Sequence, residues 1–211
     1  DRIFGGRLEV SQKCFNSMTR GFPGASVKVV LDKPSPEMLA FYQGKDCEII
    51  EVDFGNLRDA INHSYPLACA SSADFVLYAE DDYLYTADAQ ARIEAASDIP
   101  YQLLHPSDYS DRYREKGECQ LYLTKLGYWR SITKSTFTFG GKPETFAGFL
   151  KEHSKMMTAK AEHRNGFDAW WNKAVLQKNL IISPIPSIAY HLDSAAWRPP
   201  LVDWRKLWDE S

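Results

Sequence analysis

The segment 74-DFVLYAEDDYLY-85 decides the expected fold, because an apolar run is followed directly by three adjacent acids. The run Phe75 to Ala79 is rich in aromatic and aliphatic residues without polar alternation, which is typical of a strand buried on both faces of a parallel sheet. Glu80, Asp81 and Asp82 follow at the carboxyl end of this strand, where open α/β sheets bind their ligands. The segment therefore predicts either a site for a hard cation or a solvated acidic turn.

Strand and helix patterns alternate through residues 1–100, which favours an α/β fold with a mainly parallel, Rossmann-like sheet flanked by helices. Pro66 is expected to break or kink its helix near Ser64. The Ala-rich helix before residue 100 is expected to be exposed. Besides the central strand, the predicted strands are 2–8, 26–32 and 47–53, and the predicted helices are 9–22, 36–43, 56–72 and 87–98.

The pattern changes after residue 100, and we expect an α+β half over 101–211 within a single domain of 1–211. Residues 105–118 are polar and loop-like. The final helix carries Leu and Trp residues on one side, which is typical of a helix packed on a core. The predicted strands of this half are 119–129, 131–141 and 180–193, and the predicted helices are 144–157, 166–179 and 200–210.

Composition excludes several classes of protein. The chain is 44% hydrophobic, and its 25 basic and 28 acidic residues give a net charge of −3, which offers no attraction to nucleic acid or an anionic membrane. It contains neither GxGxxG nor a P-loop motif, no apolar run long enough to span a membrane and no leader pattern. Its four scattered cysteines favour reduced thiols in a cytoplasmic compartment. Because the sequence begins with Asp and not Met, it is expected to be either a trimmed chain or one domain of a longer chain.

Three segments resemble the GT-A glycosyltransferases, metal-dependent enzymes that use a nucleotide-sugar donor. NLRDAINHSYPLACASSADFVLYAEDD, 56–82, is similar to the family's helix, strand and acidic cluster. GFDAWW, 166–171, resembles the segment in which an acid opens a helix beneath the sugar, and PIPSIAYHLD, 184–193, resembles a late strand ending in a metal-binding histidine. The resemblance spans nearly the whole chain. It implies a GT-A-like fold, a UDP-sugar donor bound by 1–100, a glycan acceptor bound by 101–211, and Mn²⁺ or Mg²⁺ as the cofactor.

The resemblance assigns the metal ligands. Asp82 is the direct ligand, Glu80 is a second or water-mediated ligand or a ribose contact, and His191 is the late ligand. In an extended segment Glu80 and Asp82 point to the same side and Asp81 points away, which leaves Asp81 for the donor sugar. The alternative for His191 is a partly buried strand histidine without a ligand.

The donor-binding residues also follow from the resemblance, although the first segment lacks the family's Thr-Tyr-Asn pattern. Asp32 is expected to accept the uracil N3–H, or else to cap a turn before Pro34. Arg58 and Asn62 are expected to contact diphosphate and ribose, because a guanidinium grips phosphate oxygens, or else to form an exposed helix face. The residues expected to contact uridine are Phe4, Gly5, Gly6 and Arg7.

The residues assigned to catalysis are acids near the start of a late helix. Asp168 is expected to act as a general base if the enzyme inverts, or as an electrostatic partner of the oxocarbenium ion if it retains. Asp168 can equally be a plain helix N-cap, and Glu162 is the alternative acid. The sequence leaves both interpretations open.

Aromatic residues and a histidine are assigned to the sugar pocket. Trp170 and Trp171 are expected to form a stacking wall for the glycan acceptor, although paired tryptophans also suit a core. His105, together with Asp108, is expected to line the pocket or to belong to a structured loop.

Two other functions fit parts of the sequence. A sugar-1-phosphate nucleotidylyltransferase would need a Gly-rich, Arg-containing loop after the first strand and a downstream Lys, which Phe4 to Arg7 match poorly. A non-catalytic module that binds nucleotide sugars or glycans differs only in the use of Asp168 and the acidic cluster, so an assay must separate it from an enzyme.

Overall fold

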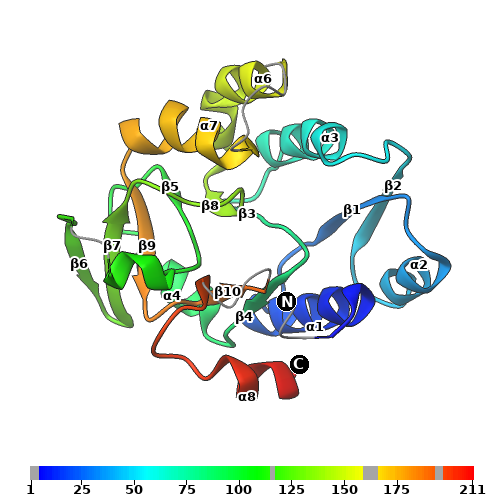
Figure 1. The fold of residues 1–211 in the computed structure, drawn as a ribbon, viewed down its shortest axis with the longest axis horizontal. Coiled ribbons are helices and arrows are strands. Elements are labelled where there is room, and N and C mark those ends of the chain that lie inside the picture. Colours follow the sequence, from blue (N-terminus) through cyan, green and yellow to red (C-terminus); the bar gives the residue numbers. More distant parts are fainter. Residues whose placement is uncertain (1–4, 115–116, 159–165, 193–196) are drawn as a thin grey trace.

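The computed structural model describes residues 5–114, 117–158, 166–192 and 197–211, with 166–168 described by their backbone only. It is a mixed α/β structure built on a six-stranded sheet of order β3-β8-β5-β9-β7-β6. Two further strand pairs, β1-β2 and β10-β4, lie beside this sheet (Figure 1). None of the described helices is both long enough and apolar enough to cross a membrane.

The strands β1 (Lys28–Asp32) and β2 (Glu48–Val52) pair in parallel, joined by the helix α2 (Pro36–Gln43). Ser35 caps α2 and proline occupies its first turn, so local signals define its start. Phe15 of the first helix packs against β1 and α2. The predictions for strands 26–32 and 47–53 and for helix 36–43 are confirmed.

The first half contains neither the expected first strand at Gly5 and Gly6 nor a helix break at Pro66. Where a first strand was expected, Gly5 and Gly6 lead into the helix α1 (Arg7–Gly21). The helix α3 (Leu57–Cys69) continues through Pro66, and one face of it buries Ile61, Tyr65 and Ala68. Packing of that face outweighs the proline, which lacks the N–H that would donate to the carbonyl of Asn62, an exposed residue.

The central strand β3 (Val76–Tyr78) is half-buried and lies at the edge of the six-stranded sheet. It pairs antiparallel with β8 (Phe139–Gly141), which in turn pairs antiparallel with β5 (Leu103–Leu104). Only β5 and β9 (Ile181–Ile185) run parallel within this sheet. The expected mainly parallel sheet is therefore wrong, because strands from the second half of the chain pair next to β3.

The second half completes the sheet and covers it. A hairpin of β6 (Leu121–Thr124) and β7 (Gly127–Ile132) forms the far edge. Aromatic side chains make the core between the sheet and its upper helices (Figure 1), among them Tyr65, Phe139, Phe146 and Trp171. These helices are α5 (Pro143–Gly148), α6 (Leu150–Thr158) and α7 (Gly166–Ala174), with a 3-10 turn at Leu176–Lys178.

The helix expected to be exposed buries one face, and the start of the polar segment 105–118 is buried. The helix α4 (Ala89–Glu94) buries Ala89 and Ile93 against Trp129 and Ile182 of the sheet. In the polar segment 105–118, the residues His105, Ser107 and Asp108 are inaccessible to solvent, and Ser110–Tyr113 forms a 3-10 helix. Partners inside the molecule bind His105 Nδ1, the Ser107 hydroxyl and the Asp108 carboxylate.

The pair β4 (Tyr83–Tyr85) and β10 (Ala189–His191) is antiparallel and follows the acidic cluster directly. Its far side packs on α1 and on the last helix, α8 (Trp204–Asp209), through Leu84, Tyr190 and Trp204. This pairing joins residues that are distant in the chain, and it positions the site described next.

Candidate metal centre

Glu80, Asp82 and His191 converge at the start of the β4-β10 pair. His191 pairs across the strands with Tyr83, and Leu192 N–H donates to the Asp82 carbonyl at 2.9 Å. One ligand atom from each of Glu80, Asp82 and His191 lies within 4.8 Å of the others. His191 Nε2 is 3.3 Å from Asp82 Oδ2. The backbone register thus places an imidazole beside two carboxylates.

The His191 ring is held flat on its cross-strand neighbour. Its ring lies 4.7 Å from that of Tyr83 with an interplanar angle of 5°. Tyr83 is buried, and its hydroxyl hydrogen-bonds to Tyr109 Oη at 2.8 Å and to the Thr136 hydroxyl. Because the Tyr83 backbone is held in the strand pair and its hydroxyl is hydrogen-bonded, its ring orients the imidazole of His191 before any ligand binds.

Glu80 is positioned by a buried threonine. Its backbone N–H donates to Thr138 Oγ1 at 3.2 Å, and the same hydroxyl lies 3.5 Å from Glu80 Oε2. The Thr138 carbonyl accepts a hydrogen bond from His105 Nδ1 at 2.6 Å. Burial, with Arg112 nearby, lowers the pKa of His105 well below its usual value, so His105 is neutral and holds Thr138 through its Nδ1–H. No sequence signal pointed to Thr138.

The Asp82 carboxylate has capacity to bind a further group. Its Oδ1 is buried, and among the described residues it accepts no hydrogen bond. A buried carboxylate oxygen without a partner is costly, and a cation would satisfy it. Two carboxylates and one imidazole are oxygen and nitrogen donors that could hold a divalent cation. The three residues could therefore hold the metal ion that the resemblance implies.

Asp81 lies outside this group of three. Both of its carboxylate oxygens accept from Arg7 Nη2, at 3.1 and 3.0 Å, so the start of α1 is tied to the acidic segment. Of the other predicted uridine contacts, Gly5 and Gly6 precede α1, and Phe4 lies outside the described residues.

The predicted donor contacts on β1 and α3 serve the fold in this structure. The Asp32 carboxylate accepts from three successive backbone N–H groups, of Phe54, Gly55 and Asn56, at 2.8 to 3.1 Å, which fits the turn-cap alternative but at a different turn. Arg58 donates to the Met157 carbonyl and so joins α3 to α6. Asn62 is exposed on α3 and lines a shallow hollow with Phe54 and His63.

Two pocket assignments need correction. Trp171 is fully buried among the core aromatics, so its ring faces cannot stack on a glycan, and Trp170 packs partly buried against the same core. His105 is also inaccessible and acts beneath Glu80 rather than in a pocket. Asp168 lies in the first turn of α7 and its side chain is outside the description, as is the whole of Glu162.

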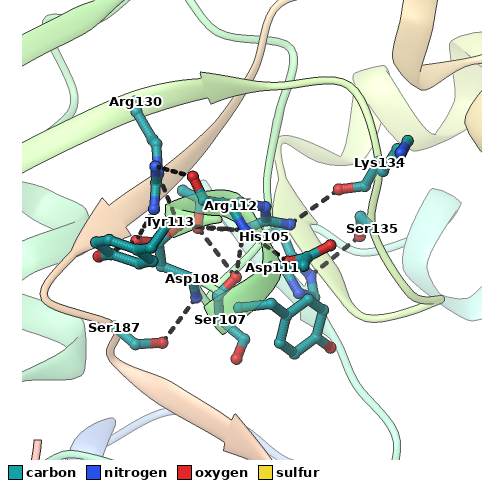
Figure 2. A network of polar contacts seen from close by, with 12 residues as sticks. His105, Ser107, Asp108, Asp111, Arg112, Tyr113, Arg130, Lys134, Ser135 and Ser187 are labelled. Carbon is teal, nitrogen blue, oxygen red and sulfur yellow. Dashed lines mark hydrogen bonds and ion pairs between the residues drawn. The ribbon is translucent and has the colours of Figure 1, made fainter. Parts of the chain in front are cut away.

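A second charged cluster, shown in Figure 2, is centred on Asp108, which is inaccessible to solvent. The buried Asp108 carboxylate accepts from Arg130 Nε and Nη2 at 2.8 and 2.6 Å and from Tyr113 Oη at 2.6 Å. Arg112 adds a contact at 3.4 Å, and the Asp108 N–H donates to Ser187 Oγ at 2.8 Å. This network fastens segment 105–114 to the sheet.

Comparison with known proteins adds no assignment. No family model matches the sequence. No curated protein matches it with significance. The features that bear on function are the geometry of the centre formed by Glu80, Asp82 and His191 and the resemblance of its segments.

Proposed function

We propose that the chain is a metal-dependent glycosyltransferase with a GT-A-like fold, which transfers a hexose from a UDP-sugar to a carbohydrate hydroxyl. The observation that carries the proposal is the convergence of Glu80, Asp82 and His191, which come from two segments far apart in the sequence. These are the residues that the resemblance assigns to the metal. A solvated acidic turn gives no reason for a late histidine to lie among the acids.

The protein's own groups supply the binding site. Asp82 offers an oxygen without a hydrogen-bond partner in the described residues, Tyr83 fixes the His191 ring, and Thr138 holds Glu80. A bound Mn²⁺ or Mg²⁺ would supply Lewis-acid stabilisation of the departing diphosphate. Arg7 pairs with Asp81 and keeps the start of α1 close to the acids.

The proposed reaction exchanges one bond at the anomeric carbon. The bond from C1 to the diphosphate oxygen breaks, the bond from C1 to the acceptor oxygen forms, and the acceptor proton passes to a base. Asp168 is the proposed base in an inverting enzyme, with Glu162 as the alternative. In a retaining enzyme Asp168 would instead stabilise the positive charge that develops on the sugar.

The proposal is tested by calorimetry and thermal shift with a panel of UDP-sugars. We expect UDP-sugar binding in Mn²⁺ or Mg²⁺, no binding in excess chelator, and none by Asp82→Ala in either condition. The sugar that raises the melting temperature most identifies the donor, because a ligand that binds only the folded state stabilises it. Binding of equal affinity in chelator would refute a metal-dependent donor site.

Transfer itself is tested at Asp168. Asp168→Asn is expected to retain UDP-sugar affinity and to lose transfer to a glycan acceptor, because the amide cannot accept the proton. Glu162→Gln is the matched variant, and it should remain active if Asp168 is the base. Normal turnover by Asp168→Asn would remove that residue from the mechanism, and absence of any transfer by wild type would favour a binding module.

A further inference from the structure

Trp197 is the most exposed of the protein's six tryptophans. Its residue is 43% exposed, whereas Trp129, Trp171, Trp204 and Trp208 are at most 5% exposed. A tryptophan offers a large apolar surface, so leaving it in water forgoes a substantial hydrophobic gain. None of the sequence motifs considered above includes this residue.

A chain of aromatic contacts links Trp197 to the candidate metal centre. The Trp197 ring lies 6.0 Å from the ring of Tyr109. The Tyr109 hydroxyl hydrogen-bonds to that of Tyr83 at 2.8 Å, and the Tyr83 ring carries His191. Trp197 is therefore linked through two tyrosines to a predicted metal ligand.

The support beneath Trp197 is rigid. Tyr109 is only 6% exposed, its hydroxyl also bonds to Thr136 Oγ1 at 2.9 Å, and the guanidinium of Arg112 covers its ring at 5.3 Å. Trp197 itself stays 43% exposed above this support. A pre-positioned aromatic surface binds a flat ligand without a large cost in conformational entropy.

We propose that Trp197 is a stacking platform for a pyranose ring of the carbohydrate acceptor, a role that rests on the proposed function. A pyranose presents a face of C–H groups that matches an aromatic ring, while its hydroxyls stay in water or reach polar neighbours. The buried Trp171 cannot do this, and Trp197 is an exposed indole linked to the centre where the donor diphosphate would bind.

Sugar binding is tested without metal or nucleotide, and UDP with Mn²⁺ is titrated separately. The indole N–H signals of ¹⁵N-labelled protein are followed by NMR during titration with methyl hexopyranosides and short oligosaccharides. We expect the shift changes to centre on one signal, assigned to Trp197 because it is absent from Trp197→Phe. A perturbation of that signal by UDP and Mn²⁺ but by no sugar would assign the indole to the nucleotide and overturn the proposal, and so would the lack of any change.

Kinetics then separate this proposal from the proposed function. Trp197→Ala should raise KM for the acceptor about tenfold, leave KM for the UDP-sugar unchanged, and be partly rescued by Trp197→Phe. Leu201→Ala is the control, because Leu201 is 69% exposed nearby in the sequence and should have no effect. An unchanged acceptor KM in an active Trp197→Ala enzyme refutes the platform alone. Sugar binding at Trp197 in a chain without transferase activity refutes the enzyme and keeps a glycan-binding site.

Discussion

Asp108 and Asp82 occupy opposite situations in one fold. Asp108 is inaccessible, and two arginines and a tyrosine hydroxyl satisfy its carboxylate. Asp82 is 32% exposed, lies close to another carboxylate, and has an oxygen that no described residue satisfies. Protein groups satisfy the hydrogen-bonding capacity of the Asp108 carboxylate, which indicates a structural role. The Asp82 carboxylate keeps capacity to bind a ligand. The following predictions test this difference.

The largest effect is expected for Asp108→Asn. The amide cannot balance Arg130 and Arg112, and breaking a buried ion pair in this way costs about 3–5 kcal/mol of unfolding free energy. Urea unfolding at neutral pH measures the loss. The control is Asp209→Asn, which removes an exposed pair with Arg205 at 3.5 Å and should cost under about 0.5 kcal/mol. Equal effects from the two variants would contradict a structural role for Asp108.

Two histidines extend the comparison, because each lies flat on a tyrosine. His153 stacks on Tyr65 at 4.0 Å and 8°, but it is 1% exposed, and burial lowers its pKa from 6.5 to about 4. Between these pH values the unfolded chain binds a proton that the folded protein does not, so stability falls as pH falls. At pH 4 the unfolding free energy should be lower than at pH 7 by roughly 3 kcal/mol through this group.

His153→Phe removes this contribution, because phenylalanine keeps a ring on Tyr65 and does not titrate. Unfolding free energies of wild type and variant are compared between pH 7 and pH 4. As the pH falls across this range, the unfolding free energy of the variant should decrease less than that of wild type. Parallel pH profiles would show that His153 is protonated in the folded state.

A smaller effect is expected at Thr138, which is not a predicted metal ligand but contacts one. Thr138→Val keeps the shape but removes the hydroxyl that holds Glu80, and Mn²⁺ affinity should fall about tenfold. Thr138→Ser restores the hydroxyl and should restore most of the affinity. Calorimetric titration with Mn²⁺ alone provides the measurement. Equal affinity of the valine variant and wild type would show that Glu80 needs no such support.

The smallest effect is expected on the stability of metal-free Asp82→Asn. The change removes a contact with His191 but also a negative charge close to Glu80, so the unfolding free energy should change by under about 0.5 kcal/mol. A loss of several kcal/mol, as expected for Asp108→Asn, would make Asp82 a structural residue. That result would remove the distinction between the two aspartates.

Local signals in the sequence predicted local elements well. Ser35 and Pro36 define the start of α2, and the apolar runs of β1 and β2 lie close to where they were expected. The order of strands was not predictable. Because β5 is only two residues long and β8 contains two glycines, neither has a sequence pattern that indicates which strand it pairs with. Long-range pairing, and not residue preference, made the sheet mainly antiparallel.

The candidate site was predictable only in part. The acids follow a strand and can be found by pattern, but the approach of His191 depends on the register of β10 against β4 and came from the family resemblance. Thr138 and Trp197 carry no motif, because their roles come from contacts with Glu80 and Tyr109. Trp171 was assigned to a pocket although paired tryptophans more often belong to a core, which is where it lies.

Gly140 limits which residues this position can hold, although it is not one of the predicted metal ligands. It lies in β8 between Leu77 of β3 and Leu104 of β5, and a Cβ atom there would be 2.4 Å from Cζ of Phe75. A single methyl group would displace the aromatic ring that leads into the strand before Glu80. Related proteins that keep the acids Glu80 and Asp82 should therefore also keep a glycine at position 140. Relatives with alanine at this position should lack the metal centre.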